Sequence, residues 1–145
     1  MSGYLLDTNV ISRLAPGRYE PSTALRDWII TEGAAGRLYI AAITIAEIER
    51  GIRKLDRKGG QERAAKLADW LDGIGSTFKD RILPFDADAA RIAGAMADDA
   101  DASGTPQDLA DVMIAATAKA HGLTVVTNNI RHFEPLDVSV QRPPE

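Results

Sequence analysis

Five short apolar runs, separated by longer segments with helical spacing, limit the fold more than any other feature of the sequence. Each run has the length of a strand that is buried on both faces of a parallel sheet. Between the runs, apolar residues recur every three or four positions, which is typical of amphipathic helices. The predicted strands are Tyr4–Leu6, Leu38–Ala41, Ile82–Phe85, Thr124–Thr127 and Val138–Val140. This alternation predicts an α/β sandwich with a mostly parallel central sheet of about five strands.

Composition excludes several kinds of site and location. The 145 residues suffice for one domain with its own core, and the chain has no cysteine. Disulfides, thiolate zinc sites and cysteine nucleophiles are therefore excluded. No apolar run approaches the roughly 20 residues that cross a bilayer, and no export signal is evident, so we expect a cytoplasmic protein. A net charge of −4 argues against indiscriminate binding of nucleic acid but permits a local basic patch.

Two acidic residues that follow predicted strands each have two interpretations. Asp7 ends the first strand at the carboxyl edge of the sheet, where open α/β folds form their sites. The same position suits the N-cap of the next helix. Glu47 follows the second strand at the same edge, but Thr44–Glu47 also fits the capping box Thr-x-x-Glu of a helix that begins at Thr44. Both interpretations are open at this point.

Asp111 is more informative because its helix is apolar almost all the way round. We expect this helix to run from Thr105–Pro106 to His121, after an acidic loop over residues 98–104. Asp111 then lies in the second turn, beyond capping reach, and Asp108 takes the third helical position. A half-buried carboxylate needs a cation nearby, which is either an arginine or a metal ion.

Other polar residues complete an oxygen-rich set. Asn128 and Asn129 follow the fourth strand, where asparagine also serves turn geometry. His132, in the next loop, is either a base or a surface residue. Carboxylates and amides without cysteine favour a hard cation such as Mg²⁺ or Mn²⁺.

A basic stripe lies on the predicted helix that carries Glu47. Its members recur at helical spacing and are Arg50, Arg53, Lys54 and Arg57. One interpretation is an ordinary solvated helix face. The other is a ridge beside an acidic metal pocket, which would guide a nucleic-acid backbone to that pocket.

Four segments resemble those of PIN-domain proteins in their order and spacing. They are Leu5–Ser12, Thr44–Ile48, Asp111–Ala118 and Gly122–Asn129. The chain is similar to the small VapC-type toxins, including their FitB-like branch, over nearly its whole length. We expect a single PIN domain over residues 1–145, with a loosely ordered tail over residues 141–145. The resemblance implies a Mg²⁺- or Mn²⁺-dependent endoribonuclease, the toxin of a type II toxin–antitoxin pair, in which a metal-activated water cleaves RNA phosphodiesters.

The resemblance also implies roles for individual residues. Asp7, Glu47 and Asp111 become metal ligands, and Asn129 becomes a catalytic residue that orients water or a ligand carboxylate. His132 stands where a fourth acid is common in the family, so we expect one firmly bound metal. Weaker candidates for substrate contact or support are Thr8, Asn9, Thr127, His132, Arg50, Arg53 and Arg57.

The implied partners are RNA, a cognate antitoxin protein and a second copy of the chain, in a homodimer that can join a larger toxin–antitoxin complex. Antitoxins of the family often place an arginine against the carboxylates. DNA would be contacted only through the antitoxin, and no membrane is involved.

Two other classes remain open. A haloacid-dehalogenase-like phosphotransferase also has an aspartate after its first strand, but needs a second aspartate where this chain has Asn9. A non-catalytic PIN-fold module would only pair with an antitoxin or a DNA-binding partner. The presence of Asp7, Glu47 and Asp111 together favours the enzyme, and metal-dependent cleavage of RNA separates the two classes.

Overall fold

Five parallel strands form the centre of the protein. The computed structural model describes residues 2–17 and 19–145. The sheet has the order β3-β2-β1-β4-β5, and every neighbouring pair is parallel. The strands are β1 (Tyr4–Leu6), β2 (Leu38–Ala41), β3 (Ile82–Leu83), β4 (Thr124–Val126) and β5 (Val140–Gln141). The predicted parallel α/β sandwich is confirmed.

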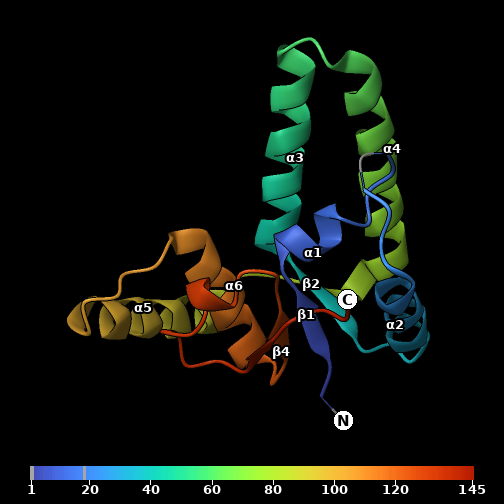
Figure 1. Ribbon diagram of the computed structural model, residues 1–145. Coiled ribbons are helices and arrows are strands. Elements are labelled where there is room, and N and C mark those ends of the chain that lie inside the picture. The colour runs from blue at the N-terminus through green and yellow to red at the C-terminus, as the bar shows by residue number, and fades with distance from the viewer. Residues whose placement is uncertain (1, 18) are drawn as a thin grey trace.

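Helices connect the strands and cover the sheet. The helix pair α3 and α4 projects away from the sheet as a long hairpin, while α5 and α6 pack together beside it (Figure 1). The helices are α1 (Thr8–Ser12), α2 (Thr23–Ala34), α3 (Ala42–Arg57), α4 (Gln61–Phe78), α5 (Ala87–Ala102) and α6 (Leu109–Ala120), with 3₁₀ turns η1 (Lys79–Arg81) and η2 (Ile130–His132). None of these helices is both long and apolar enough to cross a membrane.

Two apolar cores lie on opposite faces of the sheet. Successive side chains of a strand point to opposite faces. Leu5 and Val125 therefore enter the core that α5 and α6 cover, whereas Leu6 and Val126 enter the core beneath α3 and α4. All four side chains are fully buried. Burial on both faces explains why these strands are continuous apolar runs rather than alternating ones.

The predicted boundaries between α5 and α6 are wrong. Residues 98–104 were expected to form a loop, but α5 continues to Ala102 because Ala100 keeps its apolar face in the core. Gly104 then adopts a positive φ of 75°, and the N–H of Thr105 bonds the carbonyl of Ala100 at 2.9 Å, which ends α5. Thr105 therefore closes one helix instead of beginning the next.

The last strand lies slightly later than expected. Gln141, which we placed in a loosely ordered tail, is paired with Val126 in β5. Pro143 and Pro144 beyond it are half-buried. Because β5 is parallel to β4, these prolines follow the same edge of the sheet where β1 and β4 end.

Close packing before β1 yields a stability prediction. A Cβ at Gly3 would lie 2.5 Å from the carbonyl oxygen of Arg37, which accepts the N–H of Tyr4 at 2.8 Å. We expect Gly3→Ala to lower the free energy of unfolding in urea by about 1–3 kcal/mol. Gly94→Ala on α5 is the control, because a Cβ there has no neighbour within 4 Å, and it should raise stability by about 0.5–1 kcal/mol. Similar effects from both substitutions would contradict the packing argument.

Candidate active site

Asp7 is a buried carboxylate at the carboxyl end of the central strand β1, with 4% of its surface exposed. Its Oδ1 accepts the N–H of Thr8 at 2.8 Å, so Asp7 is the N-cap of α1, as one interpretation predicted. Its Oδ2 accepts the hydroxyl of Thr127 at 2.7 Å. Burial raises the pKa of Asp7, and these two hydrogen bonds oppose that rise.

Thr127 connects the ends of β1 and β4 through its buried hydroxyl. Besides donating to Asp7, the hydroxyl accepts the N–H of Asn129 at 3.0 Å and the side-chain amide of Asn9 at 3.4 Å. The side-chain oxygen of Asn9 in turn accepts the N–H of Asn128 at 3.1 Å. One donor and two acceptor positions are all that a hydroxyl offers, so Thr127 is fully engaged.

Glu47 faces α1 instead of capping its own helix. Its Oε1 accepts the hydroxyl of Thr8 at 2.6 Å, and the hydroxyls of Thr8 and Thr44 lie 3.1 Å apart. The capping-box interpretation is wrong, because α3 begins at Ala42 with Ala41 at the N-cap position. Glu47 therefore lies in the second turn of α3, too far along to bond the first amides.

Asp111 lies in the first turn of α6, whereas we had predicted the second. The helix begins at Leu109 with Asp108 at the N-cap position, where the Asp108 side chain makes no capping bond. Asp111 is 18% exposed at its side chain, and its Oδ2 lies 3.3 Å from Nδ1 of His132. Burial, followed by the nearby charge of Asp7, raises the pKa of Asp111 to about 6. The basic group beside it is thus an imidazole rather than an arginine.

These carboxylates line one open groove of about 440 Å³. Its lining residues are Asp7, Thr8, Asn9, Ser12, Arg13, Tyr19, Glu47, Asp111 and Asn129. The structure therefore brings together the acids predicted from the sequence. Three further lining residues, Ser12, Arg13 and Tyr19, were missed. Ser12 and Arg13 had a sequence signal, since they lie four residues after Thr8 and Asn9 and hence on the same faces of α1, whereas Tyr19 had none.

The basic stripe does not line this groove. Its four members are exposed on α3, and Arg53 donates to Glu49 at 2.9 Å in a surface pair one helical turn apart. That pair uses part of the positive charge of the stripe. That the other three members, Arg50, Lys54 and Arg57, contact RNA stays a prediction.

Comparison with known proteins decides the family. The sequence model described as PIN domain matches residues 4–137. The chain belongs to the PIN domain family. It is similar to the toxin FitB of Neisseria gonorrhoeae, with 39% identity over 140 residues, and to the VapC ribonuclease Y4jK of Sinorhizobium fredii, with 37% identity over 140 residues; each alignment covers 96% of both chains. The structure of FitAB bound to an IR36 DNA fragment matches with a TM-score of 0.82 and 36% identity, over 97% of this chain and 94% of that chain.

Membership of the PIN domain family confirms the resemblance drawn from the four sequence segments and sets aside the haloacid-dehalogenase alternative. In this PIN domain, the acids that could contribute oxygen ligands to a metal ion are Asp7, Glu47 and Asp111. Within the described ranges, 2–17 and 19–145, no three acidic or imidazole side chains converge closely enough to enclose an ion alone. The oxygen donors nevertheless suit a hard cation such as Mg²⁺, which usually keeps several waters and therefore needs few protein ligands.

The raised pKa of Asp111 leads to a pH prediction for the metal-free protein. Between about pH 4 and 6, the folded chain binds more protons at Asp111 than the unfolded chain, so stability falls as the pH rises through this window. We expect Asp111→Asn to remove this loss, which is on the order of 1–3 kcal/mol. Thermal unfolding in a chelator from pH 4 to 7 measures the difference. Parallel stability curves for wild type and variant would contradict the assignment.

Proposed function

We propose that this PIN domain is a metal-dependent endoribonuclease and the toxin of a type II toxin–antitoxin pair. The observation that carries the proposal is the meeting of Asp7, Glu47 and Asp111, from three separate elements, in one open groove. Relatives named as a ribonuclease and a toxin, similar over nearly the whole chain, support it. The toxin would act in the cytoplasm, where its RNA substrate lies.

The residues of the groove would divide the work. Asp7, Glu47 and Asp111 would hold one Mg²⁺ or Mn²⁺, which supplies Lewis acidity toward water and the scissile phosphate. Thr127 and the N–H of Thr8 fix the two oxygens of Asp7, while the hydroxyl of Thr8 orients Glu47. The raised pKa of Asp111 supports metal binding at these acids. It indicates desolvated carboxylates that lie close together and repel one another, and a cation between them would relieve that repulsion.

We further propose an antitoxin as the protein partner, because the chain is also similar to a chain of a toxin–antitoxin complex from Klebsiella pneumoniae, with a TM-score of 0.65 and 25% identity. The similar FitAB structure is bound to a DNA fragment. An arginine of the antitoxin would fit the acidic groove, and DNA would be contacted only by that partner. The homodimer stays a prediction. On α2, Ile30 is 63% exposed and could contribute to such an interface, whereas Trp28 packs its ring on Tyr4 with 5.1 Å between centroids.

Two acids of α6 provide the test of catalysis. Asp111→Asn keeps the shape but removes the charge, so Mg²⁺-dependent cleavage of RNA should fall by more than about 100-fold, since loss of a merely supporting group costs 10- to 100-fold. Asp108→Asn is the matched control: this exposed acid makes no capping bond, so we expect near-normal cleavage and a stability change of about 1 kcal/mol or less.

A gel assay with and without a chelator measures both variants. Wild-type cleavage by Asp111→Asn, or its loss in Asp108→Asn alone, would overturn the ligand assignment. Absence of any Mg²⁺-dependent cleavage by the wild-type chain would favour the non-catalytic module.

The basic stripe is tested by charge reversal. Arg50→Glu combined with Arg57→Glu should weaken RNA binding and reduce its salt slope by about 1 per lost phosphate contact, while metal affinity stays unchanged. Arg53→Glu should have a smaller effect, because Arg53 is already paired with Glu49. Binding is measured without Mg²⁺, so that the RNA remains intact. An unchanged affinity and slope in the double variant would show that the stripe is only a solvated helix face.

A further inference from the structure

An aromatic side chain stands exposed at the mouth of the acidic groove. Tyr19, in the segment between α1 and α2, is 53% exposed and lines the groove together with Arg13. The guanidinium of Arg13 lies 5.4 Å from the centroid of the Tyr19 ring, a cation–π arrangement. We propose that Tyr19 and Arg13 form a platform on which a base next to the cleaved bond stacks. This inference rests on the proposed ribonuclease activity.

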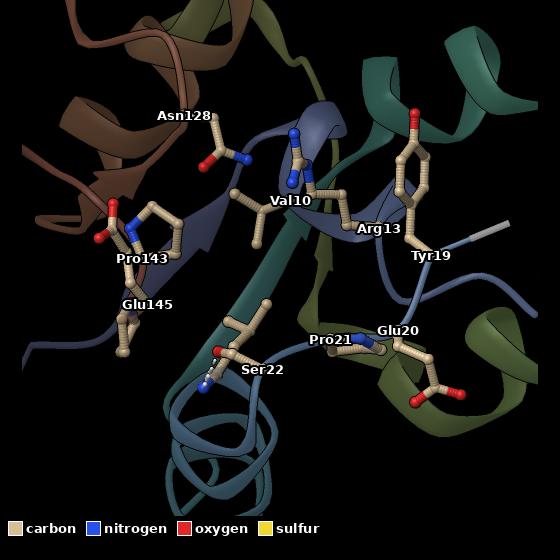
Figure 2. Close-up of a pocket in the computed structure, with 11 residues that line it drawn as sticks. Val10, Arg13, Tyr19, Glu20, Pro21, Ser22, Asn128, Pro143 and Glu145 are labelled. Atoms are coloured by element: carbon tan, nitrogen blue, oxygen red, sulfur yellow. Dashed lines mark hydrogen bonds between the residues drawn. The ribbon is translucent and has the colours of Figure 1, made fainter.

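A second hollow continues from the platform. It has a volume of about 390 Å³ and shares Arg13 and Tyr19 with the acidic groove. Figure 2 shows these two side chains together with the polar groups of Ser22 and Asn128 that also line it. An RNA strand can therefore pass from the carboxylates, over the platform, into this hollow without leaving the surface of the protein.

The chemistry of the second hollow suits a base better than a phosphate. The carboxylate of Glu145 lines it and would repel a phosphate, while the carboxylate of Glu20 is paired with Arg26 at 3.2 Å. The hydroxyl of Ser22 and the amide of Asn128 can bond the edge of a base. Single-stranded RNA is recognised in this way, by unstacked bases that lie on aromatic rings or guanidinium planes. Within the described part of the chain Arg13 forms no ion pair, so its N–H groups can bind the adjoining phosphate.

The experiment pairs a protein variant with an RNA variant. The full chain with Mg²⁺ first cuts a short single-stranded RNA, and the cut is mapped. Abasic nucleotides are then placed singly around this cut. At one neighbouring position the abasic RNA should lower kcat/KM of the wild type by about 5- to 100-fold, and Tyr19→Ala should lose a similar factor on intact RNA. The two changes together should cost no more than either alone, because both remove the same stack.

Three variants complete the design. Tyr19→Phe keeps the ring and should stay close to wild type. Arg13→Ala should raise KM more than it lowers kcat and reduce the salt slope by about 1, whereas Arg91→Ala, an exposed arginine of α5, should change neither. Circular dichroism checks the fold of each variant.

Several results would overturn the platform. Normal cleavage by Tyr19→Ala would do so. The platform would also be wrong if the losses from Tyr19→Ala and from the abasic RNA multiplied at every abasic position, or if the wild type cleaved all abasic RNAs normally. Normal cleavage with weakened inhibition by the antitoxin would assign Tyr19 to the protein interface instead. A wild type that cuts no RNA refutes the proposed function itself, before the platform is tested.

Discussion

The hydrogen bond from the Thr127 hydroxyl to the Asp7 carboxylate is the interaction on which the site depends. A carboxylate that is 4% exposed would be costly without such partners. The bond is possible because β1 and β4 pair in parallel with Leu6 opposite Val126, which brings the next residue of each strand together. A slip of one residue would send every side chain of the strand to the other face and break the bond. The geometry of the groove therefore depends directly on the register of the sheet.

The strand order explains why the other two acids reach the same place. Strand β1 lies in the middle of the sheet, with β2 on one side and β4 on the other. Helix α3 leaves the carboxyl end of β2 directly and carries Glu47 in its second turn. Helix α6 runs back toward the start of β4, so its first turn, with Asp111, lies at the same edge. This convergence partly buries like charges close together, and the pKa of Asp111 is raised as a result.

The sequence was sufficient for the sheet, because each buried strand is an apolar run. It was also sufficient for the three acids, because Asp7 follows β1 directly, Glu47 lies early in the helix after β2, and Asp111 lies on a largely apolar helix. It was insufficient where two local patterns competed. Thr105–Pro106 fits a helix start, yet tertiary packing of Ala100 extends α5. The N–H of Thr105 then bonds the carbonyl of Ala100 at the C-terminal end of α5. The pattern at Thr44 likewise fits a cap, but the chain turns into α3 earlier, at Ala42. Tyr19 could not have been placed, since no periodicity relates a loop residue to a distant groove.

The groove is lined by three carboxylates rather than four, because His132 stands where the family resemblance assigns a fourth acid. The imidazole of His132 lies 3.3 Å from the carboxylate of Asp111. The pKa of Asp111 is still raised, so the imidazole does not offset the burial of the acid. One divalent cation would balance most of the charge of the three carboxylates, whereas a second would lack a carboxylate of its own. A second ion would therefore need oxygens from the RNA itself, and its affinity would depend on substrate.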